Sequence, residues 1–211
     1  MALRMPPMEL DAGAIPPSDD PDAPDATALA GRHLVLVGLM GVGKSTVGPL
    51  VADALGRRFI DLDAEVERRA GRTVRELVTI DGEPEFRRLE AETMAELVAA
   101  PTPVVLATGG GAVLDVHSRQ LMRDRPLVVW LRASVDTLVD RVGGGDAGLR
   151  PLLDDGPVEA LTRLAGERDD LYREVADVEV DTTLDDANGV AASVLTAVGE
   201  RRLLLAGEQD S

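Results

Sequence analysis

The chain has 211 residues, of which 45% are apolar, and this is enough for one domain with a substantial core. Its net charge of -16 disfavours a nucleic-acid partner, because phosphate backbones attract clustered lysine and arginine. The absence of cysteine excludes structural disulfides and thiolate metal sites, and it fits a reducing cytoplasm.

Residues 1–30 differ in composition from the rest of the chain. They hold six of the thirteen prolines and the acidic segment PPSDDPDAPDA, which shows no apolar periodicity. Such a segment buries too little apolar surface to offset its ordering entropy, so we expect a disordered acidic tail rather than a docking arm. No apolar stretch follows Arg4 as a secretory signal would require, and no run in the chain approaches the roughly 20 apolar residues of a membrane span.

Five short apolar runs follow, and each has the length of a buried strand. They are HLVLV (33–37), FIDLD (59–63), VVLAT (104–108), LVVWL (127–131) and VEVDT (178–182). Longer segments with helical spacing separate them. Continuous apolar strands that alternate with helices indicate a parallel sheet covered on both faces. We therefore expect a single α/β domain over residues 31–205 with a five-stranded parallel sheet.

The stretch GLMGVGKS, residues 38–45, directly follows the first expected strand and fits G-x-x-x-x-G-K-[ST]. Glycines let consecutive backbone N–H groups turn inward around phosphate oxygens, and a helix N-terminus adds favourable charge. Lys44 has the reach for the β- and γ-phosphates, and Ser45 has the hydroxyl that binds Mg²⁺. The stretch thus predicts a nucleotide triphosphate site. Pro49 lies inside the helix expected after it, and it predicts a kink or a helix start shifted to near Ser45.

Three further motifs lie near the expected carboxyl ends of strands or on a following helix. FIDLDAEVE places Asp61 and Asp63 two residues apart at a strand end, which would put both on one side of that strand. EPEFRRLE places Arg87 on a helix beside Arg88, which we interpret as a solvated charge, and ATGGGAV places three glycines after the next strand. Ligands of open α/β sheets bind at the carboxyl ends of strands, so we expect these motifs to converge on the phosphate loop.

Together these motifs resemble the shikimate kinase family. The matching segments are GLMGVGKSTVG, DLDAEVE, GRTVREL, DGEPEFRRLE, TGGGAV, LRPLL and RDDLYREVA, and they span residues 34 to about 182 in this order. The resemblance implies a three-layer P-loop kinase fold with a five-stranded parallel sheet and a mobile lid. It implies transfer of the γ-phosphoryl group of ATP to the 3-hydroxyl of shikimate with Mg²⁺, in the pathway to chorismate and the aromatic amino acids.

The resemblance also assigns roles to residues of this chain. For the nucleotide it implies Gly41, Val42, Gly43, Lys44, Ser45, Thr46 and Arg150. For shikimate it implies Asp63, Arg87, Gly109, Gly110, Gly111 and Arg168. For Mg²⁺ it implies Ser45 directly and Asp61 through water, and the catalytic residues would be Lys44, Asp63 and Arg150. Whether Asp63 accepts the hydroxyl proton or only orients the hydroxyl stays open, because a loose transition state needs little base strength.

Two loops complete this interpretation. Residues 141–153, RVGGGDAGLRPLL, resemble the mobile lid that carries Arg150, which would supply positive charge and exclude water when closed. After the last strand the family usually has a basic residue that packs on adenine, whereas this chain has TLDDAN at 183–188. Arg141 is the alternative contact for adenine.

Two other functions stay open. A related kinase could act on another small polyol acid such as gluconate, although Asp63, Arg87, the three glycines and Arg168 favour shikimate. A non-catalytic shikimate-binding module would require a damaged phosphate site, and Lys44, Ser45, Asp61 and Arg150 are all present. We expect a monomer that acts on a small molecule without nucleic-acid or membrane partners.

Overall fold

The computed structural model describes residues 31–124, 126–143 and 156–209. Five strands form one parallel sheet in the order β2-β3-β1-β4-β5, which confirms the predicted sheet. The strands are β1 (Leu34–Val37), β2 (Arg58–Asp61), β3 (Val104–Ala107), β4 (Leu127–Arg132) and β5 (Val178–Asp181). The three central strands are almost completely buried, as their continuous apolar runs require.

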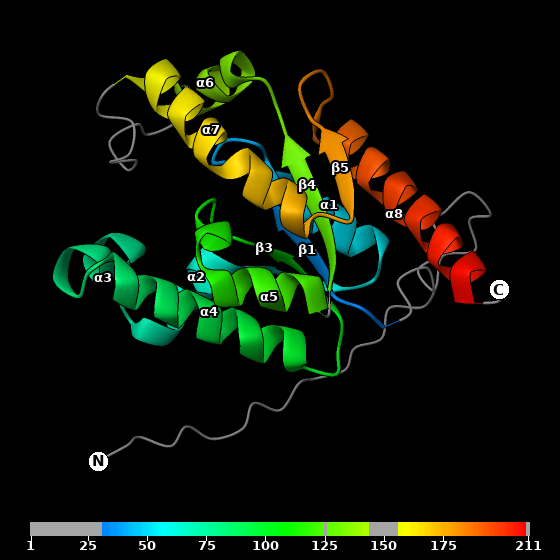
Figure 1. Cartoon of the computed structure of the whole chain (residues 1–211), viewed down its shortest axis with the longest axis horizontal. Helices are drawn as coiled ribbons and strands as arrows, with labels where there is room; N and C mark the ends of the chain where they lie inside the picture. Colours follow the sequence, from blue (N-terminus) through cyan, green and yellow to red (C-terminus); the bar gives the residue numbers. More distant parts are fainter. Residues whose placement is uncertain (1–30, 125, 144–155, 210–211) are drawn as a thin grey trace.

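Helices cover both faces of this sheet (Figure 1). Their bounds are α1 (Lys44–Ala54), α2 (Leu62–Ala70), α3 (Val74–Ile80), α4 (Glu83–Ala99), the 3₁₀ turn η2 (Ala112–Leu114), α5 (Val116–Asp124), α6 (Val135–Gly143), α7 (Pro157–Val175) and α8 (Ala187–Gln209). Helices α1 and α8 pack against each other, and α5 and α7 both contact β4. The crossover after β1 runs toward β2 and the one after β3 runs toward β4. Right-handed crossovers in opposite directions place α1 on one face and α5 on the other.

This reversal of direction occurs between the neighbouring strands β1 and β3. The phosphate loop follows β1, and the three glycines follow β3. A crevice opens where connections of adjacent parallel strands leave toward opposite faces of the sheet. The topology therefore brings the two glycine-rich segments, 70 residues apart in the sequence, to one place.

One element boundary differs from the sequence-based expectation. Strand β2 ends at Asp61, and α2 begins at Leu62, so Asp61 and Asp63 do not share one side of a strand as predicted. The reason is that Asp61 caps the helix: its Oδ1 accepts a hydrogen bond of 3.3 Å from the N–H of Ala64. Asp63 consequently lies in the first turn of α2.

The start of α1 also differs from the expectation based on Pro49. The helix begins at Lys44 and is continuous through Pro49 to Ala54, so the predicted shift of its start is wrong. Gly43 adopts the left-handed region with φ of 103°, and its carbonyl accepts bonds from the N–H groups of Thr46 and Val47. These contacts fix the first turn at Lys44 in spite of the proline that follows.

Two of the predicted segments lie outside the described residues. They are the acidic tail, residues 1–30, and most of the predicted lid, residues 144–155, which includes Arg150. Residues 141–143 at the start of that predicted lid form the end of α6. Within the described ranges, no helix combines the length and the apolar character needed to span a membrane.

Candidate active site

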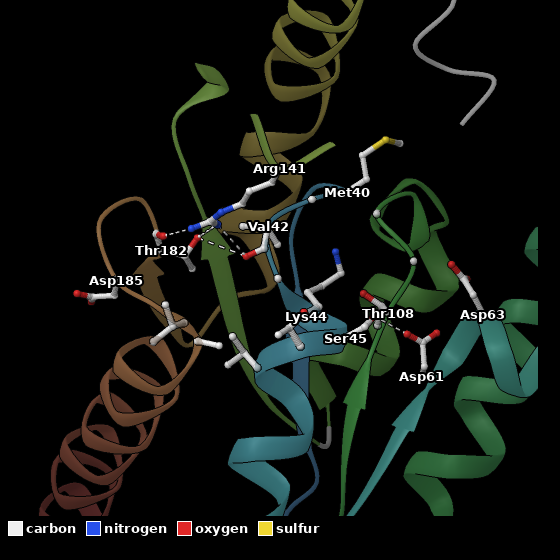
Figure 2. A pocket seen from close by; sticks show the side chains of 18 of the residues that line it. Met40, Val42, Lys44, Ser45, Asp61, Asp63, Thr108, Arg141, Thr182 and Asp185 are labelled. Carbon is white, nitrogen blue, oxygen red and sulfur yellow. Dashed lines mark hydrogen bonds between the residues drawn. The ribbon is translucent and has the colours of Figure 1, made fainter. Parts of the chain in front are cut away.

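A cavity of about 730 Å³ lies at the carboxyl ends of β1, β2 and β3. Figure 2 shows Asp61 and Asp63 at one end of the cavity and Arg141, Thr182 and Asp185 at the other. The phosphate loop lies between them. Gly38 has φ of 139°, and a Cβ there would overlap the carbonyl oxygen of Leu131 in β4, so only glycine fits the start of the loop.

Lys44 is the first residue of α1, and only 8% of its surface is exposed. Its Nζ donates to the carbonyl oxygens of Gly38 at 2.6 Å and Leu39 at 2.9 Å. The loop backbone therefore holds the ammonium group beside the N-terminus of α1. Two positive features, the ammonium and the helix end, are placed together where phosphate groups would bind.

Ser45 and Asp61 form the pair that was predicted to hold magnesium. The Ser45 hydroxyl donates to Oδ2 of Asp61 at 2.7 Å, while the other oxygen of Asp61 caps α2. A hydroxyl and a carboxylate are hard oxygen ligands of the kind that Mg²⁺ takes. Among the described residues, no group of three histidine or acidic side chains lies close enough together to bind a metal ion through protein ligands alone. This donor set fits an ion that keeps waters and shares phosphate oxygens.

Asp63 lies against the glycine turn that follows β3. A Cβ built on Gly109 would lie only 2.8 Å from Oδ1 of Asp63 and from Oε1 of Glu90, so glycine is required there. Burial raises the pKa of Asp63, and the charge of Asp61 raises it further against the opposing charges of Lys44 and Arg87. A carboxylate with a raised pKa is a better proton acceptor than an exposed one.

Arg87 and Glu90 form an ion pair on the face of α4 that meets this turn. Nη1 of Arg87 donates to Oε2 of the fully buried Glu90 at 2.7 Å, and Nη2 donates to Glu83 at 3.2 Å. A Cβ on Gly111 would overlap the guanidinium of Arg87. Sequence reasoning missed Glu90, although its place three residues after Arg87 on one helix was a usable signal.

Arg168 reaches the same turn from α7 on the opposite side. Its Nη1 donates to the Gly110 carbonyl oxygen at 3.0 Å, and the hydroxyl of Tyr172 donates to the same oxygen at 2.6 Å. Arg168 and Tyr172 are both buried. The structure thus brings Asp63, Arg87 and Arg168 to one glycine turn. Arg88, as predicted, is exposed and pairs with Glu85 and Glu92.

Several buried polar atoms around this turn have no hydrogen-bond partner within the described part of the chain. They are Asp63 Oδ1, Arg87 Nε, Glu90 Oε1 and Arg168 Nε. Buried polar groups in native structures are nearly always paired, so a concentration of unpaired donors and acceptors indicates a place for a polar ligand. Two guanidinium groups favour a planar anion such as a carboxylate there, and Asp63 is suited to hydroxyl groups.

The far end of the cavity has a different character. Nη1 of Arg141 donates to the Thr182 hydroxyl at 2.9 Å, and that hydroxyl donates to the Val42 carbonyl of the phosphate loop at 3.3 Å. Asp185 and Asp186 also line the cavity at this end, and they belong to the loop 183–188, which contains no basic residue. The structure therefore places the cationic side chain of Arg141 at this end of the cavity.

The burial of Glu90 leads to a prediction about stability. Burial raises its pKa from 4.5 to about 7, although Arg87 opposes this shift. Between these pH values the folded carboxyl keeps a proton that the unfolded one has lost. Protonated Glu90 therefore makes its full contribution to the free energy of unfolding below pH 4.5, and this contribution is lost as the pH rises through 7. We expect Glu90→Gln to remove this loss, so that unfolding free energies of wild type and variant diverge by on the order of 3 kcal/mol between pH 4.5 and 8.

Urea unfolding at several pH values measures this divergence. Glu92→Gln, an exposed carboxylate on the same helix, controls for the loss of one charge. A constant difference between wild type and Glu90→Gln across this pH range would show that folding does not raise the pKa of Glu90.

A parallel sheet with a phosphate loop after its central strand, and a recessed carboxylate beside that loop, defines a P-loop kinase. A sequence model of the family described as shikimate kinase matches residues 40–199. The chain belongs to the shikimate kinase family.

Curated relatives support this assignment over most of the chain. A shikimate kinase of Symbiobacterium thermophilum is 43% identical over 170 residues, which cover 80% of this chain and 97% of the relative. A shikimate kinase of Caulobacter vibrioides is 45% identical over 176 residues, which cover 82% of this chain and 86% of the relative. The predicted family is therefore confirmed.

Solved structures agree on the fold. The shikimate kinase from Acinetobacter baumannii in complex with shikimate has a TM-score of 0.74 and 37% identity, and the match covers 83% of this chain and 94% of that one. A gluconokinase from Sinorhizobium meliloti has a TM-score of 0.60 and 21% identity, with coverage of 84% and 97%. The second match shows a shared fold and gives no support to gluconate as the acceptor.

Proposed function

We propose that this protein transfers the γ-phosphoryl group of ATP to the 3-hydroxyl of shikimate, giving shikimate 3-phosphate and ADP on the way to chorismate. The observation that carries the proposal is the convergence of Arg87 and Arg168, from two different helices, on the glycine turn beside Asp63. Shikimate has one carboxylate for the two arginines and hydroxyl groups for the aspartate. The name of the relative solved with shikimate supports the same acceptor.

The reaction forms a bond between the acceptor oxygen and the γ-phosphorus and breaks the bond between that phosphorus and the bridging oxygen of ADP. In this proposal Asp63 accepts a hydrogen bond from the attacking hydroxyl and takes its proton as the new bond forms. Arg87 and Arg168 hold the carboxylate, which fixes the ring so that the hydroxyl faces the phosphate loop. Positioning of this kind accounts for much of phosphoryl-transfer catalysis.

The nucleotide residues have separate roles. The backbone of Gly41, Val42, Gly43 and Thr46 receives the phosphates, and Lys44 balances charge on the transferring group. Ser45 would hold Mg²⁺ directly and Asp61 through water, and that ion would neutralise phosphate charge. Arg141 would contact the base end. We further propose a monomer in the cytoplasm, where ATP is available, and light scattering after size exclusion would test its mass.

Arg150 is proposed as a lid residue on the basis of the resemblance in LRPLL. We expect Arg150→Ala to lower turnover much more than it weakens shikimate binding, because its charge would act on the transferring phosphoryl group. Steady-state turnover and calorimetric shikimate affinity measure the two effects separately. Arg163→Ala, at an exposed position of α7, is the matched control. Unchanged turnover would refute the role.

The test of the whole proposal is ADP release from MgATP with shikimate, gluconate or quinate as the acceptor. We expect release only with shikimate, and its loss in Lys44→Ala. Shikimate binding without ADP release would instead identify a binding module. Release with gluconate or quinate would keep the kinase and change the acceptor.

A further inference from the structure

The carbonyl oxygen of Gly110 accepts two hydrogen bonds from one helix. Arg168 and Tyr172 lie four residues apart on α7, so both side chains project from the same face. The Tyr172 bond, at 2.6 Å, is shorter than the Arg168 bond at 3.0 Å. A carbonyl oxygen has two lone pairs, and both are used here. This carbonyl is therefore fixed toward α7.

The direction of this carbonyl determines the direction of the next N–H. In a planar trans peptide the C=O of one residue and the N–H of the following residue point in opposite directions, and the described chain has no cis peptide bonds. The N–H of Gly111 therefore points away from Tyr172. Gly111 is buried, and the described part of the chain gives its N–H no hydrogen bond. Buried backbone donors are rarely left without an acceptor, so this N–H points to a ligand oxygen.

Arg87 lies against the same residue, because a Cβ on Gly111 would overlap its guanidinium. Arg87 and Arg168 each have a buried Nε without a partner among the described residues. Two arginines and one backbone N–H thus bring unpaired donors to one glycine turn, which suits an anionic group. Tyr172 has no unpaired atom there, and its only hydrogen bond with the turn is the one to Gly110.

We propose that Tyr172 is a positioning residue for the acceptor: its hydroxyl fixes the Gly110–Gly111 peptide so that the N–H of Gly111 faces the substrate that Arg87 and Arg168 bind. The inference rests on the proposed function, because shikimate is the acceptor in question. Tyr172 itself does not touch the reacting atoms. The role depends on the hydroxyl and not on the ring.

Two features keep this hydroxyl a dependable donor. Burial raises the pKa of Tyr172 far above its usual range, so the phenol stays protonated at any physiological pH. Its ring stacks on Trp130 of β4, with 5.8 Å between centroids and 26° between planes. Because the stack holds the ring independently of the hydroxyl, Tyr172→Phe removes the hydrogen bond and leaves the packing.

The experiment measures dissociation constants for shikimate and for ADP by calorimetry in wild type, Tyr172→Phe and Trp130→Phe. We expect Tyr172→Phe to weaken shikimate binding about 10-fold, the effect of losing the hydrogen bond from the Gly111 N–H to the ligand, with ADP affinity nearly unchanged. The thermal midpoint should fall only slightly, because Arg168 still donates to the Gly110 carbonyl. Trp130→Phe removes the stacked indole but keeps the hydroxyl. It should lower the thermal midpoint and leave the shikimate affinity close to that of wild type.

Each other outcome has a definite meaning. Unchanged shikimate affinity in Tyr172→Phe, with wild type binding normally, would overturn the positioning role and leave the proposed function intact. Equal weakening of shikimate and ADP would also overturn it, because a general loss of structure affects both ligands. Failure of wild type to bind shikimate would overturn the proposed function and this inference together.

Discussion

Replacing Lys44 with alanine is expected to lower ADP release with saturating shikimate and MgATP by about 10³-fold, since preorganised charge on a transferring phosphoryl group has effects of this size. Lys44 is the only cationic residue in the loop sequence GLMGVGKS. Its Nζ is held by the carbonyl oxygens of Gly38 and Leu39, which place it at the loop. A charge that is already in place needs no reorganisation during the reaction.

The same contacts give Lys44 a structural role, and this role must be separated from catalysis. Lys44→Ala leaves the two carbonyl oxygens without this donor, so some loss of stability is expected. Thermal unfolding and shikimate affinity should therefore be measured with the rates. Lys44→Arg keeps the charge but replaces a compact ammonium by a wide guanidinium, and we expect it to remain well below wild type. Turnover within 10-fold of wild type in Lys44→Ala, with the protein folded, would contradict the assigned role.

Asp63→Asn is expected to lower turnover by about 10² to 10⁴-fold, the range that general-base side chains contribute. The amide has nearly the same size, so the packing against Gly109 should survive. It cannot accept a proton at neutral pH, and it places an N–H₂ donor where one carboxylate oxygen now lies. The buried Oδ1 without a partner is the atom that we expect to meet the attacking hydroxyl.

Shikimate affinity should change much less than turnover in Asp63→Asn, because Arg87 and Arg168 remain. Single-turnover measurements separate the chemical step from binding and product release. Asp53→Asn, on an exposed position of α1, controls for the removed charge. A variant that turns over within a few-fold of wild type would leave Asp63 with the orienting role alone.

The strands were predictable because each expected run is rich in apolar residues and lies between breakers, and each of the five strands overlaps its expected range. The boundary between β2 and α2 was missed because FIDLD was interpreted as one apolar run. The helix start was visible in principle, since aspartate is a preferred N-cap and acidic side chains favour a first helical turn. Local hydrogen bonding by Asp61 overrode the periodicity.

The site was only partly predictable for a different reason. Glu90 and Tyr172 follow Arg87 and Arg168 by three and four residues on helices, so helical spacing alone could have identified them. No such rule connects Gly109 with Asp63 and Glu90, or Thr182 with Val42. Those contacts depend on the order of the strands in the sheet, and the sequence separation of 140 residues between Val42 and Thr182 carries no local signal.

The two sides of the proposed site come from different segments of the sequence, and this has a consequence for how such a protein can evolve. Helices α2, α3 and α4 form one continuous stretch between β2 and β3, and they supply Asp63, Arg87 and Glu90 to the acceptor side of the proposed site. The phosphate loop and the base end come from other stretches, before β2 and after β4. Mutations confined to that one stretch, joined by changes on a single face of α7, would alter which molecule is phosphorylated while the ATP machinery is inherited unchanged. A lineage built on this fold can thus diversify its substrates without losing its phosphoryl donor at any intermediate step.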